Sequence, residues 1–142
     1  MLNAVEKVLF LLHAPATALA TTDALSRLAS IAQEAELDVG EQLFAPGDPT
    51  DAMFVLLDGA VRIDGADDAT RLCGVGEFVG GLALFAGDAH AVTATAVVST
   101  RVLRFDRADL HDVLDEDGEL ARALFSGLVR TLRPAALSAA VG

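Results

Sequence analysis

Three short glycine-containing stretches decide the fold: GEQLFAPGD at residues 40–48, MFVLLDGAVRI at 53–63 and GEFVG at 76–80. Throughout residues 36–106, glycines recur at short intervals, and the segments between them are rich in β-forming residues. Short strands divided by regular turn signals are typical of a β-sandwich or β-barrel. The sequence therefore predicts an all-β middle section over residues 36–106.

Helices are predicted on the N-terminal side of this section. Apolar residues recur at helical spacing over residues 2–12 and again over 24–35. Thr22 or Asp23 is positioned to cap the second helix, because a short polar side chain there accepts a hydrogen bond from the first turn. Residues 1–35 are therefore assigned to N-terminal helices.

Helical periodicity returns after the strands. It predicts a helix over 107–114 capped by Asp106 and a helix over 119–132 capped by Asp117. The order helices, strands, helices predicts a single α+β domain. Within this domain we assign residues 107–133 to the C-terminal helices and residues 134–142 to a frayed tail.

The charge of the chain restricts its partners. Among 142 residues, Asp and Glu number 21 and Lys and Arg number 10, which gives a net charge of −11. A nucleic acid requires a basic protein surface, so this charge argues against a nucleic-acid partner. None of the 10 basic residues lies between Arg71 and Arg101, which disfavours phosphate ligands in that stretch as well.

Cysteine usage and hydropathy indicate the compartment. Cys73 is the single cysteine, so no disulfide framework exists and we expect the reduced cytoplasm. The apolar run 8–12 before Ala18-Leu19-Ala20 resembles a signal peptide, but it is shorter than the usual run of about 7–15 residues. No apolar run approaches the roughly 20 residues that span a bilayer, so no membrane partner is expected.

No set of residues indicates an enzyme or a metal site. The serines lack a G-x-S-x-G motif, and His13, His90 and His111 lie far apart in the sequence. The acidic run 112–119 fails the register of a calcium loop and is typical of a solvated helix end. We therefore expect no enzymatic activity, no metal and no resident cofactor.

The three stretches quoted above together resemble the cyclic nucleotide-binding domain. The resemblance covers residues 25–132, nearly the whole chain. It implies a β-roll, also called a double-stranded jelly roll, flanked by N-terminal and C-terminal helices. It also implies a regulatory module, in which a short phosphate-binding cassette holds the cyclic nucleotide and the C-terminal helix closes over it or mediates dimerisation.

The cassette, residues 76–96, departs from the family pattern. Gly80 falls on the cassette glycine, but Gly81 stands where the family has the glutamate that binds the ribose 2′-hydroxyl. His90 stands where the family has the phosphate-binding arginine. The resemblance gives the following candidate ligand-binding residues: Gly80, Gly81, Leu82, Ala83, His90, Ala91 and Thr93.

Two hypotheses about function follow. Without the family's glutamate and arginine, the cassette lacks two charge-assisted hydrogen-bond partners for the nucleotide. Their loss weakens the binding free energy by roughly 3–6 kcal/mol, which lowers the affinity by about two to four orders of magnitude. The first hypothesis is a module that does not bind cAMP or cGMP in the family manner and acts through protein contacts. The alternative is a sensor of a cyclic nucleotide or another anion, which binds through the backbone N–H groups of Leu82 and Ala83. Only ten residues follow Leu132, too few for a helix-turn-helix, so DNA binding by this chain is not expected.

Two features remain open at this point. His90 is expected to be a solvent-exposed loop residue or else a weak, mostly neutral substitute for the arginine. An apolar stripe on the last helix either packs against the roll or forms the seam of a homodimer. It consists of Leu120, Leu124, Leu128 and Leu132.

Overall fold

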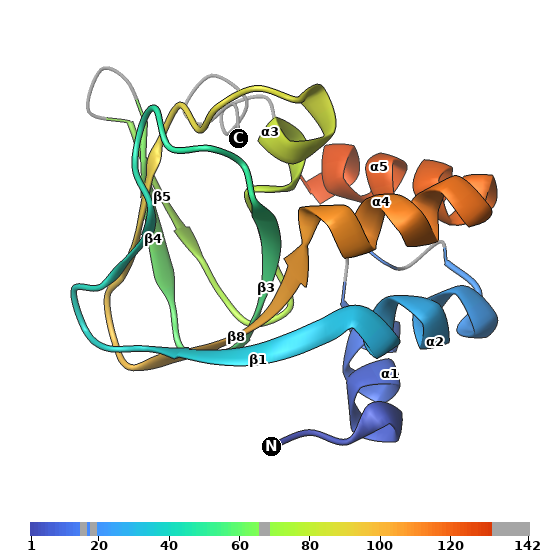
Figure 1. Ribbon diagram of the computed structural model, residues 1–142. Coiled ribbons are helices and arrows are strands. Elements are labelled where there is room, and N and C mark those ends of the chain that lie inside the picture. The colour runs from blue at the N-terminus through green and yellow to red at the C-terminus, as the bar shows by residue number, and fades with distance from the viewer. Residues whose placement is uncertain (15–16, 18–19, 66–68, 132–142) are drawn as a thin grey trace.

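The computed structural model describes residues 1–14, 17, 20–65 and 69–131 (Figure 1). Two helices precede the strands, one short helix interrupts them and two helices follow. In chain order the elements are α1 (Ala4–His13), α2 (Thr22–Ile31), β1 (Ala32–Leu37), β2 (Gln42–Phe44), β3 (Ala52–Asp58), β4 (Val61–Asp64), β5 (Thr70–Cys73), β6 (Phe78–Val79), α3 (Gly81–Ala86), β7 (Thr93–Ala96), β8 (Thr100–Asp106), α4 (Arg107–Glu116) and α5 (Gly118–Thr131).

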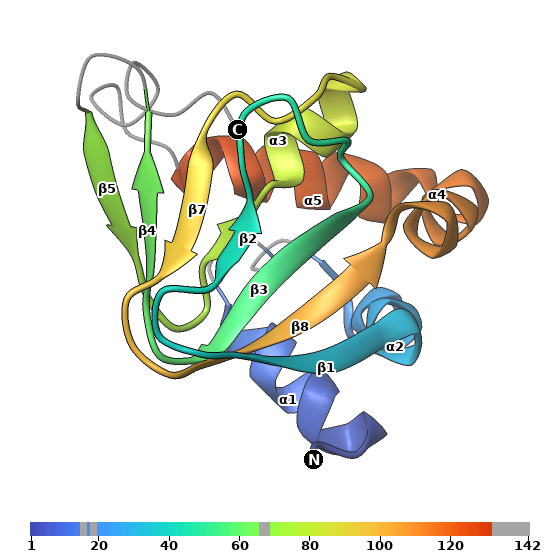
Figure 2. The ribbon, with the colours of Figure 1, turned by 60° about the vertical axis from the view of Figure 1, so that its left-hand side comes forward.

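The strands form a roll of two antiparallel sheets (Figure 2). One sheet has the order β1-β8-β3-β6 and the other β2-β7-β4-β5. Alternate residues of each strand point into the roll. Their side chains form its interior: Leu37, Phe44, Leu56, Val61, Ile63, Cys73, Val79, Val92, Ala94, Ala96 and Val102. The predicted fold class, a β-roll with flanking helices, is confirmed.

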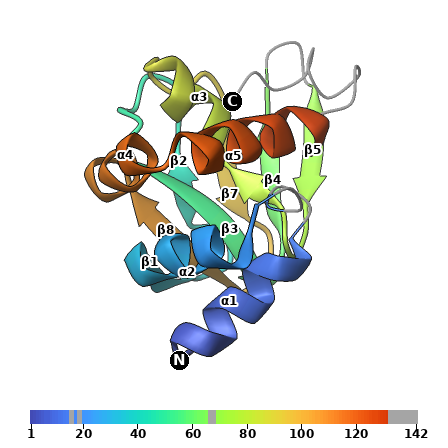
Figure 3. The same ribbon diagram turned by 90° about the vertical axis from the view of Figure 1, so that its right-hand side faces the viewer.

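The helices lie on one side of the roll, where they cover the outer face of the β1-β8-β3-β6 sheet (Figure 3). Outward residues of the strands, such as Val55 of β3 and Phe105 of β8, pack against Leu28 of α2 and Leu110 of α4. The stripe on α5 belongs to this core side, because Leu120, Leu124 and Leu128 are buried. Leu132 lies outside the described residues, as does the predicted tail 134–142.

The boundary between the N-terminal helices and the roll differs from the prediction. Helix α2 ends at Ile31, and the chain continues at once as β1, four residues before the predicted boundary at 35. Residues 32–37 instead pair with residues 100–105 of β8 in an unbroken antiparallel register. This ladder of backbone hydrogen bonds, formed with a distant strand, outweighs the helical spacing of the local apolar residues.

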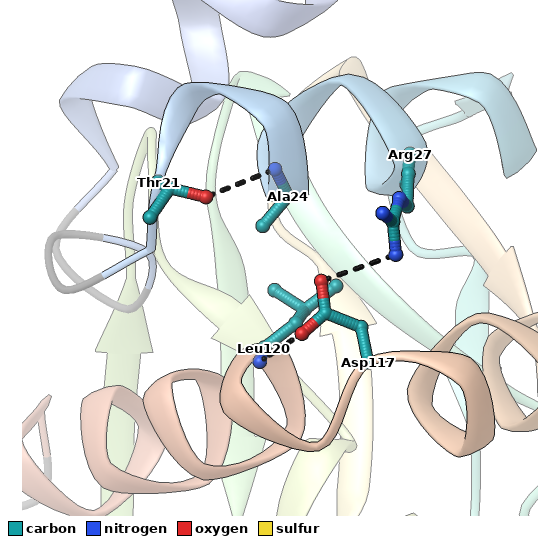
Figure 4. A network of polar contacts seen from close by, with 5 residues as sticks. All are labelled: Thr21, Ala24, Arg27, Asp117 and Leu120. Carbon is teal, nitrogen blue, oxygen red and sulfur yellow. Dashed lines mark hydrogen bonds and ion pairs between the residues drawn. The ribbon is translucent and has the colours of Figure 1, made fainter.

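Each of the helices α2 and α5 has a side-chain cap, and an ion pair joins the two helices (Figure 4). Thr21, rather than the predicted Thr22 or Asp23, caps α2, and its hydroxyl accepts a 3.2 Å hydrogen bond from the Ala24 N–H. Asp117 caps α5 as predicted, with 3.0 Å between its Oδ1 and the Leu120 nitrogen. Its other carboxylate oxygen, Oδ2, lies 3.3 Å from Nη1 of Arg27 in α2.

Asp106 does not act as the predicted side-chain cap of α4. It occupies the N-cap position, but its carboxylate contacts the guanidinium of Arg104 instead. The first N–H of the helix, that of Arg107, donates to the backbone oxygen of Asp51 at 2.8 Å. A backbone contact from the loop that precedes β3 therefore supplies part of what a cap would provide.

Candidate functional site

The cassette is built around one short helix between two left-handed glycines. Gly80 precedes α3 with φ of 83°, and Gly87 follows it with φ of 75°. The chain reverses after the helix through hydrogen bonds from the N–H groups of Gly87 and Asp88 to the carbonyls of Leu84 and Ala83, both 3.2 Å. Only glycine adopts such positive φ without strain, which explains the glycine spacing of this stretch.

Gly80 and His90 meet in the structure. A Cβ atom at position 80 would lie 3.2 Å from Cε1 of His90 and 3.3 Å from the ring of Phe44. The position therefore requires glycine for space as well as for backbone conformation.

His90 is buried, and the expectation of a solvent-exposed loop residue is wrong. Its side chain is 4% exposed and stacks on Phe44, with 3.6 Å between the ring centroids and 6° between the planes. Its backbone N–H donates to the Asp48 carbonyl at 3.0 Å, and its carbonyl accepts from the Gly47 N–H at 2.8 Å. Histidine has no local sequence signal for burial, and β2, which supplies Phe44, lies far away in the chain.

The electrostatics of His90 are those of a neutral ring. Burial lowers the pKa of His90 below its usual 6.5, and the nearby carboxylates of Asp48 and Asp51 oppose this effect only in part. Within the part of the chain that the structure describes, its buried Nδ1 has no hydrogen-bond partner. At neutral pH the ring therefore brings no positive charge to the position of the family's arginine.

Gly81 faces the C-terminal helix. A Cβ atom at position 81 would lie 2.9 and 3.1 Å from the two methyl carbons of Leu128, and 3.0 Å from Sδ of Met53. Leu128 and Met53 are both buried. Helix α5 is thus seated directly on the cassette, and a glutamate at position 81 would require Leu128 to move away.

The other candidate residues are spread around this centre. Ala83 is buried within α3, Ala91 is exposed, and Thr93 is half-buried on β7, where it is in register with Asp64 of β4. Leu82 belongs to α3. The sequence indicated Leu128 only as a member of an apolar stripe, and it gave no signal that Phe44, Met53 and Leu128 contact the cassette glycines.

Charged and metal-binding groups near the cassette are few. The guanidinium of Arg71, on β5, forms a 3.2 Å ion pair with Glu77. Among the described residues, no group of three or more His, Cys, Asp or Glu side chains is placed to hold a metal ion. In the same part of the chain, no helix has the length and apolar character needed to cross a membrane.

Comparison with known proteins assigns the family. The sequence profile of the cyclic nucleotide-binding domain matches residues 34–117. The chain is similar to the CRP-like cAMP-activated global transcriptional regulator of Mycobacterium tuberculosis, with 26% identity over 115 residues that cover 78% of this chain and 51% of that protein. The chain spans between 26% and 51% of the length of the curated relatives it matches.

Solved structures share the fold. The N-terminal domain of a transcriptional regulator from Streptomyces coelicolor A3(2) has a TM-score of 0.71 and 29% identity, covering 87% of this chain and 92% of that one. The regulatory subunit of a cAMP-independent protein kinase A from Trypanosoma brucei has a TM-score of 0.76 and 20% identity, covering 94% of this chain and 50% of that one. These relatives are named as regulators rather than as enzymes. Sequence profile, glycine positions and fold agree, and this chain belongs to the cyclic nucleotide-binding domain family.

Proposed function

We propose that this chain is a regulatory module that works without cAMP or cGMP. The observation that carries the proposal is the contact between α5 and the cassette, in which the Leu128 methyl carbons lie 2.9 and 3.1 Å from the position of a Cβ atom on Gly81. The protein's own C-terminal helix occupies the space next to Gly81. This packing favours a module with an unused cassette over the alternative of an anion sensor.

The missing side chains support the same proposal. Gly81 and His90 stand in place of the family's glutamate and arginine, which would contribute roughly 3–6 kcal/mol. His90 is neutral and stacked on Phe44, so it offers no charge-assisted bond to a phosphate. The net charge of −11 repels anions, nucleic acids included.

A relative supplies a precedent for the fold. The Trypanosoma brucei regulatory subunit belongs to a protein kinase A named as cAMP-independent. A triple mutant of that subunit is described as bound to cAMP in the A site, and its structure has a TM-score of 0.79 with 18% identity to this chain. The fold therefore occurs in a regulatory subunit named as cAMP-independent and also in a mutant of that subunit bound to cAMP.

Isothermal titration calorimetry with cAMP and cGMP tests the proposal, and the cAMP-activated regulator of Mycobacterium tuberculosis serves as the positive control. We expect no heat of binding and no rise in melting temperature up to about 1 mM nucleotide, since ligand stabilisation follows the ratio of concentration to Kd. Binding at micromolar nucleotide that is lost in the His90→Asp variant would overturn the proposal.

We further propose that the module acts through protein contacts, with a second copy of the chain, in the cytoplasm. Leu120, Leu124 and Leu128 are buried within one chain, so the contact surface is the exposed flank of α5 that carries Phe125, whose ring also packs edge-on against Phe85 of α3. Phe125 and Val129 lie one helical turn apart there and are 48% and 44% exposed. A patch on a single helix face can pair with itself across a two-fold axis.

Sedimentation equilibrium tests this contact. The wild-type chain should associate, and Phe125→Ser should shift it towards monomer, whereas Val75→Ser, a matched change at an exposed apolar residue far from α5, should not. A wild-type chain that stays monomeric at all concentrations contradicts the self-association.

A further inference from the structure

A cavity lies on the His90 side of the cassette, on the far side from α3 and α5. It has a volume of about 240 Å³ and is enclosed by the loop between β2 and β3 together with side chains of β2, β3 and β8. The residues that matter are Phe44, Asp48, Asp51, Phe54, His90 and Arg104. Neither α3 nor α5 contributes to its lining, so the cavity is separate from the face of the cassette that α5 covers.

The charged groups of the lining favour a cation. Asp48 uses Oδ2 to accept the Ala45 N–H at 2.9 Å, which leaves its second carboxylate oxygen available. Asp51 is exposed, and none of the described residues donates a hydrogen bond to its carboxylate. The guanidinium of Arg104 contacts Asp106, so the positive charge in the lining is already partnered.

His90 supplies an independent sign of an incomplete site. It forms part of the cavity wall and is 96% buried, and its Nδ1 has no partner among the described residues. Buried polar atoms in native proteins nearly always have a hydrogen-bond partner. A buried ring nitrogen without a partner, close to the carboxylates of Asp48 and Asp51, marks this wall of the cavity as a polar site whose hydrogen bonding is incomplete.

The remaining wall is apolar and the volume is small. Phe44 and Phe54 contribute aromatic rings, which contact alkyl groups and also attract cations. Pockets for drug-sized ligands measure about 300–1,000 Å³, so this cavity suits a smaller molecule. A metal ion is the weaker choice, because the described residues place no group of three or more ligating side chains.

We propose that this cavity binds a small organic cation, whose ammonium group lies between the carboxylates of Asp48 and Asp51 and whose short apolar tail packs against Phe44 and Phe54. The net charge of −11 raises the local concentration of such cations. Simple amines and zwitterionic amino acids share this ammonium chemistry, and what distinguishes them is whether the amino acid's carboxylate competes with Asp106 for the guanidinium of Arg104.

Nuclear magnetic resonance of the ¹⁵N-labelled chain tests the proposal with three matched probes: 3-methylbutylamine, leucine and 4-methylpentanoate. The amine and leucine should shift the amide signals of Asp51, Ala52, His90 and Arg104 and leave those of α3 unchanged. Tighter binding of leucine than of the amine would assign the carboxylate to Arg104, and equal binding would assign the site to amines in general. Shifts caused equally by the acid, or no shifts with any probe, would overturn the proposal.

Two variants separate the site from general surface electrostatics. Asp51→Asn should weaken amine binding by about threefold or more, in line with the loss of one exposed charge partner. Asp58→Asn removes an equally exposed carboxylate at the other end of β3 and should leave binding unchanged. An equal loss in both variants would reduce the effect to non-specific attraction and refute the site.

Discussion

Replacing Gly81 by alanine should destabilise the protein, because α5 leaves no room on the cassette for one more carbon. The new Cβ atom would lie 2.9 Å from one methyl carbon of Leu128 and 3.0 Å from Sδ of Met53. Ordinary contacts between such atoms are about 3.5–4.0 Å, so the two neighbours must yield by roughly half an ångström or more. Both are buried, so neither can turn into solvent.

The magnitude follows from two opposing effects. Overpacking a core costs about 1–3 kcal/mol, and the change from glycine to alanine in a helix regains about 0.5–1 kcal/mol. Gly81→Ala should therefore lower the free energy of unfolding by up to about 2.5 kcal/mol, with a central value of about 1 kcal/mol. Leu128→Ala alone should cost about 2–5 kcal/mol as a buried truncation. In that background Gly81→Ala should cost at least about 1 kcal/mol less, because the new methyl group enters the vacated space.

Urea unfolding followed by circular dichroism measures these differences, since the chain has no Trp or Tyr for intrinsic fluorescence. Gly118→Ala is the matched control. Gly118 is also the first residue of its helix, and a Cβ atom there meets nothing within 4 Å. It should be neutral or stabilising by up to about 1 kcal/mol.

Two results would refute the reasoning. Gly81→Ala could be as harmless as Gly118→Ala, or its cost could be the same with and without Leu128. Either would mean that α5 does not rest on the cassette in solution, and the proposal of nucleotide-independent function would lose its main support.

Three further predictions concern titration, capping and thiol reactivity. The pKa of His90 is lower in the folded state than the unfolded value of 6.5, so the unfolded chain binds more protons below that pH. The free energy of unfolding should therefore fall as the pH drops through 6.5. The His90→Phe variant, which keeps a stacked ring, should lose this part of the change in the urea midpoint. Asp117→Ala should cost about 1–2 kcal/mol in thermal unfolding, mostly from the lost cap, whereas Arg27→Ala should cost under about 1 kcal/mol because that ion pair is largely exposed. Burial raises the pKa of Cys73 to about 11, so at pH 8 only about one thiol in a thousand is ionised and iodoacetamide should react at the rate of unfolding.

Each of these predictions has an outcome that contradicts it. A His90→Phe protein with the same loss of stability between pH 7.5 and 5.5 as the wild type would place the titration elsewhere. Equal losses for Asp117→Ala and Arg27→Ala would assign the effect to the ion pair rather than to the cap. Rapid labelling of Cys73 in the native protein would show that β5 opens without global unfolding.

Features that depend on neighbours in the sequence could be predicted. Glycine is required at positions 80 and 87 by the backbone itself, with φ of 83° and 75°, and the spacing of such glycines is what identified the family. Asp117 caps α5 because its carboxylate reaches an N–H three residues later. The alternation of buried and more exposed residues along β4 and β7 also follows from strand geometry.

Only the tertiary structure decided the features that depend on distant partners. Residues 32–35 became part of strand β1 because β8 lies beside them, although the predicted helix extended to residue 35. His90 became buried because β2 places Phe44 against its ring. The Asp106 carboxylate pairs with Arg104 and therefore does not cap α4. Leu128 rests on Gly81 for the same reason, since the two residues are 47 positions apart in the chain. The sequence by itself therefore determined the family and the backbone of the cassette, whereas contacts between distant elements decided which side chains pack against the cassette glycines.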